Sequence, residues 1–91
     1  MSTYLMYGKY NPGSLGKISR ERTEKALNLI KENGGQIKSS YALFGDYDLL
    51  FIIYFAENKD AIKTSVELGN ILDISFTTFP AITIDEFDEL F

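Results

Sequence analysis

The carboxylate of Asp48 is the best-placed acid–base group in the sequence. It follows the polar turn Gly45-Asp46-Tyr47 and begins the strand whose apolar run, from Leu49 to Ala56, is the longest in the chain. A carboxylate there either accepts bonds from nearby backbone amides or lies at the mouth of a cavity, where burial would raise its pKa and make it a general base or a polar anchor. We favour the structural role, because Asp at strand ends often satisfies backbone donors. The candidate residues for such a cavity are Tyr47, Asp48, Tyr54, Ser75 and Thr77.

Other familiar chemistries are poorly supplied. The chain has no histidine and no cysteine, which excludes Ser-His and Cys-His catalysis, disulfides and thiolate metal sites. Lys17, Lys38 and Lys63 could in principle form a Schiff base, but none is surrounded by evidently apolar residues in the sequence. The acidic cluster at 85–89 has no partner cluster, and the glycines fit no phosphate-binding loop. We therefore expect no metal and no cofactor.

Composition limits the partners and the location. The 91 residues suffice for one domain, taken as 1–91, and the net charge is −4. Four of the 13 acids lie in the last seven residues, and the other nine balance nine Lys and Arg. An acidic chain without a basic stripe argues against nucleic acid, RNA included. The start shows no signal peptide, and the longest apolar run is far shorter than the ~20 residues that span a membrane. We expect a cytoplasmic protein without a membrane partner.

Periodicity and turn residues predict four strands and three helices. Ser19 is a suitable N-cap for the first helix and Gly34 a suitable C′ residue, while Gly69-Asn70 is expected to end the second helix and Pro80 to stop the fourth strand. Thr83 and Glu86 form a capping box for the last, short helix. The expected elements are strands at 3–10, 36–44, 48–55 and 71–79, and helices at about 20–33, 58–68 and 85–90.

The order β-α-β-β-α-β with a short C-terminal helix predicts an α+β, ferredoxin-like fold, in which two helices cover one face of a four-stranded antiparallel sheet. The third strand is apolar on both faces, so its less apolar set would lie on the uncovered face. That set is Asp48, Leu50, Ile52 and Tyr54, joined from the first strand by either Tyr4 and Met6 or Leu5 and Tyr7. Such a patch exceeds what monomers usually expose, and a second copy packed sheet to sheet would bury it. We expect a homodimer or a larger homo-oligomer.

Four segments in register carry a family resemblance over essentially the whole chain. They are Gly34-Gly35, Gly45-Asp46-Tyr47-Asp48, Leu68-Gly69-Asn70, and Ala81-Ile82-Thr83 leading into Asp85-Glu86-Phe87. The chain resembles the GYD-domain proteins, a bacterial and archaeal family named after the segment matched by Gly45, Tyr47 and Asp48; it departs at Ile82, where members often carry Phe. The resemblance implies a dimeric α/β-barrel assembly, in which two ferredoxin-like sheets pack face to face. It implies no settled activity.

Three functions follow as expectations. The first is a homo-oligomeric domain that binds a small, mostly apolar ligand at the sheet-to-sheet interface. The second is a cofactor-free enzyme, monooxygenase- or isomerase-like by analogy with dimeric α/β-barrel proteins, which uses Asp48 as acid or base. The third is a purely structural oligomerisation module whose interface is filled.

Overall fold

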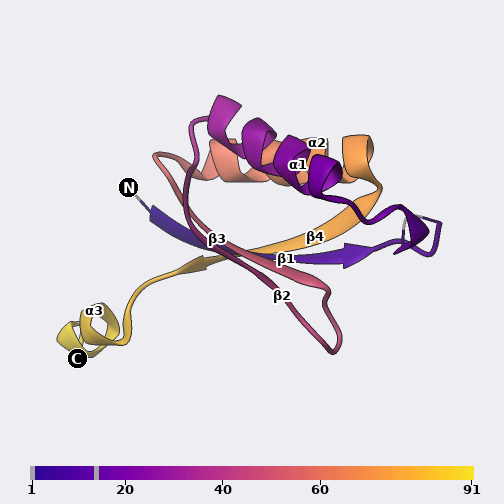
Figure 1. Cartoon of the computed structure of the whole chain (residues 1–91). Coiled ribbons are helices and arrows are strands. Elements are labelled where there is room, and N and C mark those ends of the chain that lie inside the picture. Colours follow the sequence, from indigo (N-terminus) through magenta and orange to yellow (C-terminus); the bar gives the residue numbers. More distant parts are fainter. Residues whose placement is uncertain (1, 14) are drawn as a thin grey trace.

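The computed structural model describes residues 2–13 and 15–91. The chain runs from one end of a twisted sheet through two helices to a separate C-terminal helix (Figure 1). The elements are β1 (Ser2–Tyr10), a short 3₁₀ turn (Leu15–Lys17), α1 (Arg20–Glu32), β2 (Gln36–Ala42), β3 (Leu49–Phe55), α2 (Asn58–Leu72), β4 (Ile74–Ala81) and α3 (Ile84–Glu89).

The four strands form one antiparallel sheet in the order β2-β3-β1-β4. This is the ferredoxin-like order, with the two strands of the β-α-β halves interleaved, and it confirms the predicted fold. Figure 1 shows α1 and α2 together over one face of the sheet, with the other face left without helices. That uncovered face is called the open face below.

Alternation along the strands decides which side chains enter the core. Tyr4 and Met6 of β1 lie beneath the helices, so Leu5 and Tyr7 belong to the open face, which settles the alternative left by the sequence. On β3, Phe51, Ile53 and Phe55 are buried as predicted. The core contains Tyr4, Met6, Tyr10, Ala26, Ile30, Phe51, Ile53, Phe55, Ala61, Leu68, Leu72 and Ile74.

The first helix begins and ends as its sequence indicates. The Ser19 hydroxyl accepts a hydrogen bond from the Arg22 backbone N–H at 3.2 Å, and Gly34 takes a φ of +87° just beyond the end. Gly35 then passes close under the helix. A Cβ there would lie 2.7 Å from Ile30 Cγ2 and 3.0 Å from the Ile30 carbonyl oxygen, so the helix–strand junction requires glycine.

The predicted end of the second helix and the predicted start of the fourth strand are both wrong, since α2 ends at Leu72 and β4 begins at Ile74. Helix α2 continues to Leu72, because Leu68 and Leu72 are four residues apart and both pack into the core. Burying Leu72 outweighs the ~1 kcal/mol that a mid-helix glycine costs. The left-handed residue that ends the helix is Asp73, with φ 55°.

Pro80 does not stop the last strand. It lies within β4 and pairs with Tyr4, and this is allowed because β4 is an edge strand whose outer side needs no N–H donor. The second strand also differs from its prediction: it ends at Ala42, and a bulge at Lys38 changes its alternation. Ile37 therefore faces the helices, whereas Ser39 and Tyr41 face the open side.

Within the described residues, the structure has no helix that is both long and apolar enough to cross a membrane.

Candidate functional site

The open face is a broad apolar surface with a hydroxyl-bearing margin. Leu5 pairs with Ile52 on one side and with Phe79 on the other, so these three side chains lie across the middle of the face. None of the residues on this face is buried. They are Thr3, Leu5, Tyr7 and Lys9 from β1, Ser39 and Tyr41 from β2, Leu50, Ile52 and Tyr54 from β3, and Ser75, Thr77 and Phe79 from β4.

An aromatic cluster occupies one end of the open face. The ring of Tyr7 lies 5.0 Å from that of Tyr47 and 6.0 Å from that of Phe79, measured between centroids, and the second pair meets edge to face. Thr77 is the β4 residue directly opposite Tyr7. The structure therefore brings two of the predicted site residues, Tyr47 and Thr77, around one side chain that the sequence analysis had left unassigned.

The other hydroxyl-bearing candidates lie apart from this cluster. Tyr54 is opposite Thr3, four residues along β1 from Tyr7, which is about 13 Å at the usual strand rise. Lys38 Nζ lies 5.8 Å from the centre of the Tyr54 ring. Ser75 is opposite Lys9, near the cluster, and its hydroxyl donates to Asn11 Oδ1 at 3.1 Å.

Asp48 is held by the backbone. Its Oδ2 accepts a hydrogen bond from the Tyr10 N–H at 2.9 Å, its own N–H donates to the Gly8 carbonyl at 2.8 Å, and its carbonyl accepts from the Leu43 N–H at 2.8 Å. These bonds join the start of β3 to the end of β1 and to the residue after β2. They are the interactions expected of the structural role.

A hollow of about 380 Å³ lies beside Asp48, between the β2–β3 turn and the start of α1. The prediction that Asp48 shares the open face with Leu50 and Ile52 is therefore wrong, because its carboxylate turns to the Tyr10 amide on the helix side of the sheet. Tyr10 and Asp48 line it together with Thr23 and Ser40. Burial raises the pKa of the Tyr10 hydroxyl; the Arg22 guanidinium opposes that rise and the Asp48 carboxylate adds to it. The Arg22 guanidinium also donates to the Leu72 carbonyl, which ties α1 to the end of α2.

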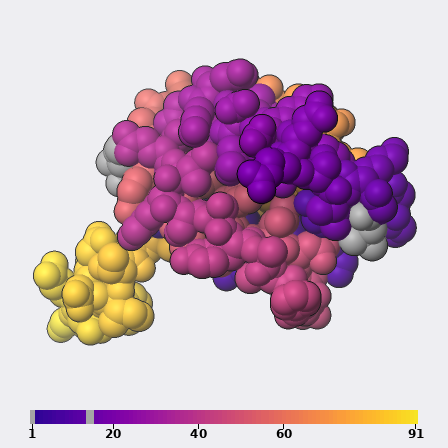
Figure 2. All heavy atoms as spheres, in the orientation of Figure 1, coloured from indigo at the N-terminus to yellow at the C-terminus, as the bar shows by residue number. Residues whose placement is uncertain are grey.

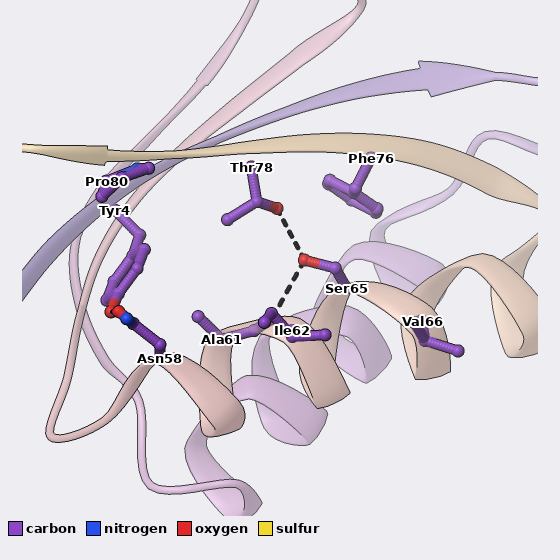
Figure 3. A pocket seen from close by; sticks show the side chains of 9 residues that line it. All are labelled: Tyr4, Asn58, Ala61, Ile62, Ser65, Val66, Phe76, Thr78 and Pro80. Carbon is purple, nitrogen blue, oxygen red and sulfur yellow. Dashed lines mark hydrogen bonds between the residues drawn. The ribbon is translucent and has the colours of Figure 1, made fainter.

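A second groove, of about 440 Å³, lies between α2 and the edge strand β4 (Figure 3). Its polar groups are paired with one another: the Tyr4 hydroxyl donates to Asn58 Oδ1, and the Ser65 and Thr78 hydroxyls are 2.6 Å apart. The walls that remain are apolar, with Ile62 and Val66 on the helix and with Phe76 and Pro80 on the strand. All nine lining residues are Tyr4, Asn58, Ala61, Ile62, Ser65, Val66, Phe76, Thr78 and Pro80.

Sequence analysis did not predict this groove, because Ile62 and Val66 follow Ala61 and Ser65 at a spacing typical of one buried helical stripe. The buried stripe is instead Ala61, Thr64, Leu68 and Leu72, whereas Ile62 and Val66 are 65% and 57% exposed. The available signal was that this helix carries more apolar residues than one stripe can hold. An outward apolar pair at positions i and i+4 indicates a second contact surface.

Comparisons with known proteins agree with this architecture. The GYD domain profile matches residues 4–91. A comparison with curated protein sequences finds no match. Among solved structures, FFRP-DM1 is similar with a TM-score of 0.64 and 25% identity, covering 90% of this chain and 100% of that one.

Two further structures show the same fold at lower identity. The leucine response regulatory protein of Mycobacterium tuberculosis has a TM-score of 0.60 at 6% identity, over 90% of this chain and 51% of its own, so this chain spans about half of that regulator. A hypothetical protein from Pyrococcus horikoshii has a TM-score of 0.58 at 21% identity, over 91% of this chain and 92% of that one.

Proposed function

The chain belongs to the GYD domain family, and from that premise we propose that it is a small cytoplasmic homo-oligomeric binding domain, one domain over 1–91, which takes a small, mostly apolar ligand between two open faces. The observation that carries the proposal is the uncovered apolar face itself. A sheet whose central Leu5, Leu50 and Ile52 are only half-buried is stabilised when another surface covers it. A second copy is the occupant that this shape fits, because two sheets pack face to face at about 10 Å.

The two-fold symmetry of such a dimer would also reunite the separated site residues. In an interface between identical faces, each end of the strands meets the opposite end in the partner when the two-fold axis lies in the interface and crosses the strands near their middle, here near Leu5 and Ile52. Tyr54 of one copy would then stand over the cluster of Tyr7 and Tyr47 in the other. The ligand would lie there, against aromatic rings and the Thr77 hydroxyl.

Binding is favoured over proton transfer because Asp48 is already engaged. A general base needs a carboxylate oxygen directed at substrate, whereas one oxygen of Asp48 accepts the Tyr10 amide. In this proposal Tyr47, Tyr54 and Thr77 contact the ligand and Ser75 borders the cavity, whereas Asp48 acts only by fixing the start of β3 to the end of β1.

Native mass spectrometry of freshly purified protein tests the assembly and the ligand together. We expect a dimer or a multiple of it, carrying an additional mass that is lost on activation in the gas phase. The matched variants are Tyr54→Phe and Thr77→Val, which keep shape and remove a hydroxyl, with the exposed Ser2→Ala as control. A monomer at micromolar concentration contradicts the proposal. A dimer whose retained ligand is unaffected by both hydroxyl variants contradicts the site.

A further inference from the structure

The C-terminal helix α3 is an amphipathic segment that packs its apolar face against no other element of the described chain. Every residue from Ile84 to Glu89 is exposed. The apolar face consists of Ile84, Phe87, Leu90 and Phe91, which are 74%, 49%, 68% and 94% exposed. In Figure 2 this segment stands off from the body as a separate lobe, and in Figure 1 it lies on the side of the sheet away from α1 and α2. A helix of six residues is marginal in water, so its apolar face needs a surface to pack against.

We propose that this arm docks into the α2–β4 groove of a second copy of the chain. The groove offers the complementary surface, since Ile62 and Val66 are exposed apolar side chains one helical turn apart. An amphipathic helix laid into an apolar groove, with anchors at i, i+3 and i+7, is a common mode of recognition. In the arm those anchors are Ile84, Phe87 and Phe91, and the Phe87 and Phe91 rings already lie 5.3 Å apart.

Charge favours the same pairing. The four acids of the arm, at 85, 86, 88 and 89, surround its apolar face. Lys59 and Lys63 follow the outer side of α2, beside the apolar pair, and their side chains are 79% and 67% exposed. Their only ion pairs in the described part of the chain are to Glu57 at 3.1 Å and Glu67 at 3.9 Å, surface contacts of the kind that contribute little. An acidic arm beside this basic row would gain from both lysines.

The backbone between β4 and α3 favours a second copy over the arm's own groove. The own groove runs back along β4 from Pro80 towards Phe76, so the arm would have to reverse within Ile82 and Thr83. A two-residue reversal of the β-hairpin type uses a residue with positive φ. Among the described residues only Gly34, Gly45 and Asp73 have one, and Thr83 is extended at φ −69° and ψ 159°. An arm that continues outward reaches a neighbour instead. This contact uses another surface than the open face and does not depend on what binds there.

Disulfide trapping tests the docking. Because the sequence has no cysteine, only the introduced thiols can form a disulfide. Two single-cysteine proteins, Val66→Cys in the groove and Asp88→Cys in the arm, are mixed at about 10 μM under mild oxidation. Docking raises the effective concentration of the thiols to the millimolar range, so the mixed disulfide should form about a hundredfold faster than from random collision. The matched control replaces Val66→Cys by Lys25→Cys on the exposed side of α1, and it should react at the collision rate.

Phe87→Ser, added to the arm partner, should slow trapping by about tenfold or more, since it removes an anchor without touching the core. Equal rates for the groove and control pairs would overturn the proposal. So would a double variant, Val66→Cys with Asp88→Cys, that closes within one chain at a rate independent of concentration, because that result assigns the arm to its own groove.

Discussion

Replacing Ile52 by Asp should weaken the dimer strongly while leaving the single chain folded. Ile52 lies at the centre of the open face, opposite Leu5 on β1 and Ser39 on β2, and is half-buried in the single chain. Because the side chain points away from the core, the Ile52→Asp monomer should remain folded, with a loss of about 1 kcal/mol from reduced strand preference and packing.

The dimer should respond far more strongly, since each substitution occurs twice across a two-fold interface. Each copy loses about 1 kcal/mol, the part of isoleucine burial that is completed only on association. Each also buries a carboxylate without a partner, at about 1–3 kcal/mol or more. The two copies together lose about 5 kcal/mol, which raises the dissociation constant by at least three orders of magnitude.

Sedimentation velocity over a concentration series measures that constant, and urea unfolding of the same samples measures stability. The matched control is Ile71→Asp, which places the same charge on a half-exposed isoleucine of α2, outside the open face and the α2–β4 groove. We expect this variant to associate as the parent does. A folded Ile52→Asp protein with unchanged association would refute the face-to-face dimer, and dissociation of both variants would show that added charge alone was responsible.

Substitutions at three further positions, Tyr10, Gly35 and Asp48, test the interactions within one chain. Burial raises the pKa of Tyr10 in the folded chain, so the unfolded chain releases this proton at a lower pH, near pH 10. The free energy of unfolding should therefore fall as pH rises through this range. Tyr10→Phe should lessen that fall, as measured by urea unfolding between about pH 9 and 11. Gly35→Ala should cost about 1–3 kcal/mol, because its Cβ meets Ile30 backbone at 3.0 Å; Gly16→Ala, with open space around it, should change the urea midpoint little. Asp48→Ala should lower the free energy of unfolding by about 1–3 kcal/mol, because it leaves the Tyr10 N–H unpaired. Asp48→Asn keeps an acceptor for that N–H and should lower it less. If the two variants have the same urea midpoint, the Asp48 side chain does not stabilise the fold through this hydrogen bond.

The fold was predictable because its signals are local and repeated. Strand alternation, the Ser19 cap and the glycines at 34 and 45 each indicate the same chain path. The errors arose where a tertiary contact overrides a local signal. Gly69-Asn70 is a sound helix stop by composition, but Leu72 needs the helical continuation to reach the core. The sequence alone does not show that Leu72 reaches the core only when the helix continues past Gly69-Asn70.

The candidate site was predictable only in part, for a related reason. Side chains alternate between the two faces along each strand, and this alternation places Tyr54, Ser75 and Thr77 on one face. Their separation along that face depends on how β3 and β4 are registered against β1, and register depends on turn geometry and on the bulge at Lys38. The ring contact of Tyr47 with Tyr7 depends in addition on a loop conformation that no periodicity describes.

The two edges of the sheet also limit how the protein can aggregate. An edge strand with free N–H and C=O groups is a template for fibrils, in which identical chains add strand by strand. Here one edge, β4, contains Pro80, and the other, β2, is interrupted by the bulge at Lys38. Both devices interrupt the regular ladder that a fibril requires. A concentrated solution of this protein should consequently form finite particles and resist thioflavin-positive fibre growth.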